Sequence, residues 1–71
     1  MKWTVIYEQD PTSGDWSAHA ADLPVFVGGD TRQEAETLIQ GAIAFHLEGL
    51  RADGLPVPAP RSEAGAVDVA A

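Results

Sequence analysis

The residues that could do chemistry are two histidines and 11 acidic residues, with no cysteine. His19 and His46 lack a metal-ligand spacing such as His-x-x-x-His. A Mg²⁺-dependent nuclease needs several carboxylates that converge on the metal. Here Glu8 stands at the end of the first candidate strand, and Asp10 and Asp15 lie among turn-forming residues. We therefore expect no catalytic residue, no metal ligand and no cofactor, so that the protein is not an enzyme.

The charge balance indicates which partners to expect. Four Lys and Arg residues face 11 Asp and Glu residues, for a net charge of −7 on 71 residues. Phosphate binding needs clustered Lys and Arg, so the composition argues against direct contact with nucleic acid. No apolar run is long enough to cross a membrane, and the N-terminal residues are not a signal peptide, so we expect a cytoplasmic protein with no membrane contact. The acidic surface either serves solubility or steers a basic partner, and both interpretations stay open.

One long helix is predicted over about 32–53. It opens with a capping box, in which the Thr31 hydroxyl accepts from the Glu34 amide and the Glu34 carboxylate reaches back to the Thr31 amide. Gly54 can end the helix in a left-handed conformation, and Pro56 prevents a restart. Apolar residues recur at steps of three and four, and we expect this stripe to pack on a sheet. The stripe consists of Ala35, Leu38, Ile39, Ala42, Ile43, His46 and Leu50.

Three strands are predicted before the helix, near 2–9, 16–21 and 25–28. The first two show period-two alternation, with one mainly apolar face on the first strand. Residues 10–15 between them are turn formers, which predicts an antiparallel hairpin. The residues on that apolar face are Trp3, Val5 and Tyr7.

These elements indicate one small α+β domain over 1–60, followed by 61–71 as a tail or edge strand. The fold is a two-layer β-β-β-α(-β) arrangement, an antiparallel sheet with one long helix. The Pro-rich segment 55–60 is expected to be extended, and 66–70 alternates weakly. A single helix leaves one sheet face and two edges open, so we expect a homo-oligomer, either a dimer or a tetramer. The aromatic residues expected on that open surface are Trp3, Trp16 or Phe26.

Several short pieces along residues 3–60 resemble the HicB-like antitoxin domain in their order and spacing. The pieces are Tyr7-Glu8, Trp16-Ser17-Ala18, Asp22-Leu23-Pro24, Gly29-Asp30-Thr31, Glu34-Ala35, Leu47-Glu48-Gly49-Leu50, Gly54 and Pro58-Ala59-Pro60. The resemblance implies a partial ribonuclease-H-like fold without nuclease activity. It also implies a bacterial toxin–antitoxin function, in which the domain neutralises HicA, a small basic mRNA-cleaving toxin.

Two departures from the family pattern change these expectations. Val25-Phe26 follows the Leu-Pro pair where the family usually has Gly, so the turn there is expected to differ. No DNA-binding segment fits after Pro60, so the resemblance covers the toxin-facing domain only. Repression of an operon would then require another protein.

The expected function is therefore a protein-binding module that neutralises a HicA-like toxin. The alternative is a stand-alone homo-oligomeric regulatory or scaffold domain of the same fold, without a toxin. The residues predicted to bind the partner lie in and beside the hairpin and are Glu8, Asp10, Asp15, Trp16 and Asp22. Thr31 and Glu34 are predicted to have a structural role as the helix cap.

Overall fold

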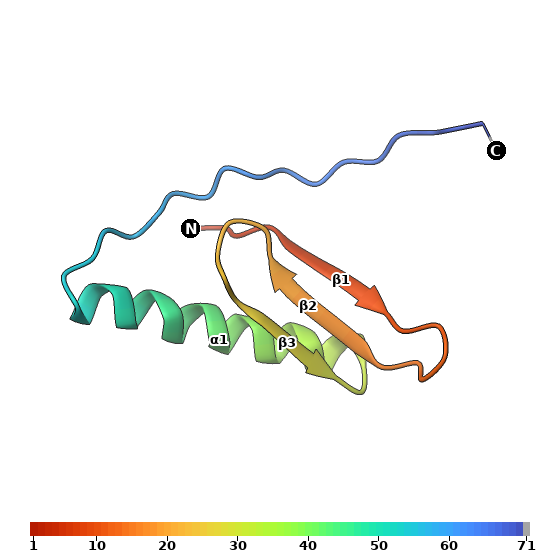
Figure 1. Ribbon diagram of the computed structural model, residues 1–71, viewed down its shortest axis with the longest axis horizontal. Helices are drawn as coiled ribbons and strands as arrows, with labels where there is room; N and C mark the ends of the chain where they lie inside the picture. The colour runs from red at the N-terminus through yellow and green to blue at the C-terminus, as the bar shows by residue number, and fades with distance from the viewer. Residues whose placement is uncertain (71) are drawn as a thin grey trace.

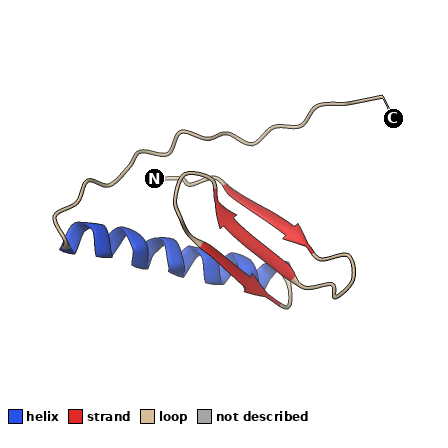
Figure 2. Ribbon diagram, viewed as in Figure 1, coloured by secondary structure: helices blue, strands red, loops and turns tan. Residues whose placement is uncertain are grey.

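The computed structural model describes residues 1–70 and shows three strands followed by one long helix (Figures 1 and 2). The elements are β1 (Val5–Gln9), β2 (Trp16–Ala20), β3 (Phe26–Gly29) and α1 (Arg32–Ala52). The α+β class and the β-β-β-α order predicted from the sequence are confirmed. Residues 53–70 contain no strand. Of the two alternatives predicted for the C-terminal segment, the described residues therefore form a tail and not an edge strand.

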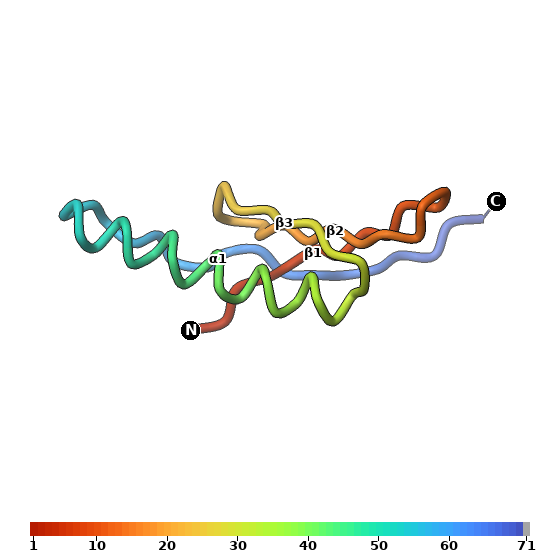
Figure 3. The backbone as a smooth tube through the Cα atoms, turned by 90° about the horizontal axis from the view of Figure 1, so that it is seen from below, coloured from red at the N-terminus to blue at the C-terminus, as the bar shows by residue number. Residues whose placement is uncertain are grey.

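The three strands form one antiparallel sheet in the order β1-β2-β3. Tyr7 pairs with Ala18, and Ala18 pairs with Val27, which places these side chains on the face that covers α1. The intervening row of side chains faces away from the helix. That row contains Ile6, His19 and Phe26. Figure 3 shows the helix on one side of the sheet and no other element on the opposite side.

Strands β1 and β3 are the two edges of the sheet. On β1, the Thr4 carbonyl accepts from the Ala21 amide, and the Asp10 amide donates to the Asp15 carbonyl. Because pairing alternates along an antiparallel strand, the backbone groups of the odd-numbered residues of β1 point away from β2. The outer edge of β1 therefore presents unpaired backbone donors and acceptors along the side of the sheet.

The helix begins with the predicted cap and ends at the predicted glycine. The Thr31 hydroxyl accepts from the Glu34 amide at 3.1 Å. The reciprocal bond differs from our expectation, because the Glu34 carboxylate accepts from the Asp30 amide at 3.4 Å and not from Thr31. At the other end Gly54 has φ 69°, and its amide and that of Leu55 donate to carbonyls in the last turn of the helix. This is a Schellman ending, which requires the left-handed conformation that glycine adopts without strain.

The core is small and uses a narrower stripe of α1 than predicted. Its buried members are Ala18, Ala20, Leu23, Ala35, Ile39 and Ile43. Leu38 is 44% exposed, so its predicted packing on the sheet is wrong. Adjacent helical residues point about 100° apart, and a three-stranded sheet that covers Ile39 cannot also cover Leu38. Of the other predicted contacts, Ala42, His46 and Leu50 are half-buried.

The aromatic residues of the hairpin contribute to this core. Trp3, Tyr7 and Trp16 are half-buried and pack against it, whereas Phe26 is 78% exposed on the outer face of the sheet. Arg32, at the start of the helix, lies over the Tyr7 ring at 4.1 Å from the ring centre. This cation–π contact joins the first turn of α1 to β1.

We expect truncation of the most buried large side chain to lower the free energy of unfolding far more than the same truncation on the sheet face that α1 does not cover. Ile39 is 2% exposed, and Ile39→Ala should lower the free energy of unfolding by about 2–5 kcal/mol. Ile6 is 43% exposed, and Ile6→Ala should cost less than about 1 kcal/mol. Chemical denaturation of the two variants measures the difference, and equal losses would contradict the observed placement of the core.

The helix cap gives a second stability prediction. Thr31→Ala removes the hydroxyl that accepts from the Glu34 amide and should cost about 1 kcal/mol in the free energy of unfolding. Thr31→Ser keeps the acceptor and serves as the control. An unchanged denaturation midpoint for Thr31→Ala would show that another group caps this helix.

Candidate partner-binding site

The turn between β1 and β2 is fixed by its own hydrogen bonds. The Asp10 amide donates to the Asp15 carbonyl at 2.8 Å, and the Gly14 amide donates to the Asp10 carbonyl at 2.9 Å. The Asp10 carboxylate accepts from the Thr12 and Ser13 amides at 2.8 and 3.0 Å. An aspartate that bonds to the backbone in this way imitates a backbone turn and holds the loop in one shape.

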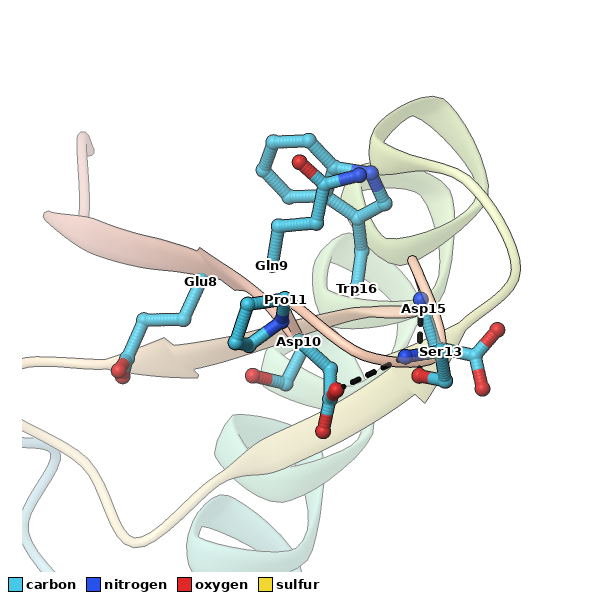
Figure 4. A pocket seen from close by; sticks show the side chains of 8 residues that line it. Glu8, Gln9, Asp10, Pro11, Ser13, Asp15 and Trp16 are labelled. Atoms are coloured by element: carbon cyan, nitrogen blue, oxygen red, sulfur yellow. Dashed lines mark hydrogen bonds between the residues drawn. The ribbon is translucent and has the colours of Figure 1, made fainter.

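A shallow, open hollow of about 450 Å³ lies at this end of the hairpin (Figure 4). Eight residues line it, namely Glu8, Gln9, Asp10, Pro11, Ser13, Asp15, Trp16 and Ser17. Four of the five residues predicted to bind a partner are thus brought together by the hairpin. The fifth, Asp22, does not line the hollow.

The side chains around the hollow divide between the two faces of the hairpin. Gln9 pairs with Trp16 across the strands, and Figure 4 shows these two side chains together on one side. The Gln9 amide group also donates to the Gly14 carbonyl at 3.2 Å. The carboxylates of Glu8 and Asp10 lie on the other side (Figure 4). A partner at this end of the molecule would therefore meet an aromatic surface and a carboxylate surface next to each other.

The hollow carries negative charge that no Lys or Arg of residues 1–70 neutralises through an ion pair. The Ser13 and Thr12 amides that donate to Asp10 hold the pKa of its carboxyl below the ordinary value, so its charge persists to a lower pH than that of a free aspartate. Glu8 lies 3.8 Å from His19, and the nearby Arg32 is paired with Glu36 at 3.3 Å. The arrangement suits Lys or Arg side chains supplied by another molecule.

Asp22, which lies outside the hollow, has a structural contact with the tail. It follows β2, and its carboxylate accepts from the amides of Arg61 and Ser62 at 3.0 Å each and from the Ser62 hydroxyl at 2.7 Å. The Thr4 hydroxyl donates to the Ser62 carbonyl at 2.7 Å. These bonds hold the tail beside the start of β1, where it runs back past the N-terminus (Figure 1). The Ser62 and Arg61 donors also hold the pKa of Asp22 below its usual range.

Sequence reasoning missed some of these contributions. The Asp10-Pro11-Thr12-Ser13 run carries the signal of a side-chain-capped turn and could have identified Asp10 as a structural residue. Gln9, Ser13 and Ser17 line the hollow, but nothing in their local sequence marks them. The link from Asp22 to Ser62 joins residues 40 positions apart and has no local signal.

A second hollow of about 640 Å³ lies between the N-terminal residues and α1, and its lining includes Trp3, Tyr7 and Gln40. Within residues 1–70, no group of three or more His, Asp or Glu side chains is placed to hold a metal ion. No helix in those residues is long and apolar enough to cross a membrane. Comparison of this chain with protein-family models, curated proteins and solved structures finds no match.

The tail contact should depend on pH. The pKa of Asp22 is lower in the folded chain than its usual value of 3.8, so the unfolded or undocked state binds more protons as the pH falls. The contribution of Asp22 to tail docking should be complete above about pH 5 and should be lost as the pH falls through the folded pKa below 3.8. NMR shifts of the Arg61 and Ser62 amides across pH 2–6 would report it.

Asp22→Asn is the matched control for this titration. It removes the ionisable group and should flatten the pH dependence of the Arg61 and Ser62 amides, leaving only the smaller effect of other carboxylates. Amide shifts that titrate equally in the variant would show that Asp22 does not govern the tail.

Proposed function

We propose that this chain is an antitoxin-type module that neutralises a small, basic, mRNA-cleaving toxin of the HicA kind. The observation that supports it most is the hairpin hollow, where Glu8, Asp10 and Asp15 gather without a neutralising Lys or Arg ion pair beside the half-buried Trp16. Interfaces commonly combine an aromatic contact with complementary charge around it. The resemblance to HicB-like domains supplies the toxin class, and a cytoplasmic setting follows from such a target.

The mechanism we propose is competition for one basic surface. A toxin that cleaves RNA holds the phosphates with Lys and Arg. The carboxylates of the hollow would engage the same side chains, so that RNA and antitoxin exclude each other. Because the turn is held by its own hydrogen bonds, the carboxylates need little ordering on binding, which reduces the entropic cost of association.

The alternative is a stand-alone homo-oligomeric regulatory or scaffold domain. Ile6 and Phe26 are exposed on the uncovered sheet face, which favours a protein partner of some kind. A second copy of the chain would cover these side chains as well as a toxin would. The two functions differ in whether the bound partner is a basic protein whose RNA cleavage stops.

Charge reversal in the hollow should slow association with a basic toxin. Asp10 holds the turn, so the better choice is the double variant Glu8→Lys/Asp15→Lys, which leaves the Asp10 bonds intact. We expect the association rate to fall by about tenfold at low salt, and added salt to reduce the difference, because charge steering is screened over about 10 Å at 0.1 M. The dissociation rate should change less.

The control is Asp53→Lys/Asp68→Lys, which makes the same change in net charge at exposed positions outside the hollow. The assay uses the product of an adjacent gene that encodes a small basic protein, and it measures both binding and RNA cleavage. The proposal fails if no such protein is encoded there, or if it binds no tighter than micromolar and still cleaves RNA. Equal slowing by both double variants would show that net charge alone steers the encounter and that the hollow is not the contact.

A further inference from the structure

Helix α1 carries a second apolar stripe that its own sheet does not cover. It contains Leu38, Ala42, Phe45, Gly49 and Ala52, at successive spacings of four and three. This is the seam spacing of helices that pack along each other. By helical geometry the stripe lies about a quarter turn away from the Ile39 side that faces the core. Phe45 is 79% exposed and Leu38 is 44% exposed.

Gly49, one of the small residues in this stripe, has no role inside the chain that packing would explain. A Cβ atom added at Gly49 would meet no atom within 4 Å, so the glycine is not required by a close contact. Glycine in a helix interior is also less favourable than alanine. A partner that approaches closely at Gly49 would explain why the helix has a glycine at this position.

The isolated chain is more open than a compact protein of its mass. Its accessible surface is 5486 Å², whereas a compact monomer of 7.5 kDa exposes about 4,200 Å². Its radius of gyration is 14.2 Å, against about 11 Å expected for this length. Part of this surplus belongs to the extended tail, and part belongs to the half of α1 that the sheet does not cover, with the exposed Phe45.

We propose that a second copy of this chain packs antiparallel along the stripe. With the two-fold axis passing between Ile43 and Ala44, Leu38 lies opposite Gly49 of the partner, and Ala42 lies opposite Phe45 of the partner. Each large side chain then meets a small one, in four layers related by the two-fold axis. A parallel pair would instead set Phe45 against Phe45 and leave the two Gly49 residues facing each other.

Charge does not oppose the central layers of this arrangement, although each chain carries a net charge of −7. Between Leu38 and Gly49 the stripe is flanked by Ile39, Gly41, His46 and Glu48. Glu48 is the single carboxylate of this central part, and the antiparallel register places it nearest Gly41 of the partner. Carboxylates come level with each other only at the two ends of the pair, where Asp53 lies opposite Glu34 of the partner.

The positions of the sheets also favour the antiparallel pair. Each sheet covers only the N-terminal half of its helix, and the C-terminal half projects beyond it (Figures 1 and 3). In the antiparallel pair the projecting half of one helix lies beside the covered half of the other. The two sheets then lie toward opposite ends of the helix pair.

The test is sedimentation of the whole chain at micromolar concentration, where the expected mass is twice 7.5 kDa. Phe45→Asp places a charge in the seam, and Gly49→Leu fills the space opposite Leu38. Each should raise the dimer Kd at least about tenfold. Ala44→Asp and Ala44→Leu make comparable changes at an exposed residue on another side of the helix and should leave the Kd unchanged. Circular dichroism checks that each variant keeps its helix.

The direction of the helices needs its own measurement. A spin label on Arg51→Cys, a unique cysteine in this chain, would be separated from its partner by about 22 Å along the axis in the antiparallel pair at 1.5 Å per residue. A parallel pair would bring the labels within an interhelical distance of about 10 Å. A monomeric wild-type chain, a dimer that survives both seam variants, or the short label distance would each overturn the proposal.

Discussion

The length of α1 relative to its sheet is the constraint on which the rest of this structure depends. A helix of 21 residues is about 31 Å long, whereas strands of five residues span about 17 Å. One sheet can therefore bury only the first half of one stripe of the helix. The consequences are a core with three alanines among its six buried residues, a projecting half-helix, and large apolar side chains in contact with water.

Because the core is small, polar contacts at its border contribute a larger share of the free energy of unfolding. The net stability of a small domain is a few kcal/mol, so a cap or a hydrogen-bonded turn is a sizeable fraction of it. The Thr31 cap, the Asp10 turn and the Asp22 link to the tail each fix one end of an element or segment. The acidic residues of the chain consequently have two kinds of role. Some hold backbone in place, whereas the Asp15 carboxylate is exposed and that of Glu8 lies 3.8 Å from the His19 ring.

The sequence predicted those features that depend on local patterns. Alternation gave the strands, and the Thr31 and Gly54 signals gave the ends of the helix within a residue or two. It failed for Leu38, because helical periodicity shows that a residue is apolar and near a stripe but not how wide the opposing sheet is. It also missed the contact of Asp22 with Ser62, because the two residues lie 40 positions apart in the sequence. The sequence did predict that the turn end of the hairpin is one site, because a hairpin brings the residues on either side of its turn together. These residues are Glu8, Asp10, Asp15 and Trp16.

The open edge of β1 gives the acidic composition a further meaning. Unpaired backbone groups along an edge strand are a template on which another extended chain can add, and this is a route to aggregation. Mutual repulsion between chains of charge −7 opposes such contacts at neutral pH. Near the isoelectric point of about 4.3 that repulsion disappears while the edge stays unpaired. We therefore expect the carboxylates to oppose fibre growth as well, and the solubility of this protein to be lowest in mild acid.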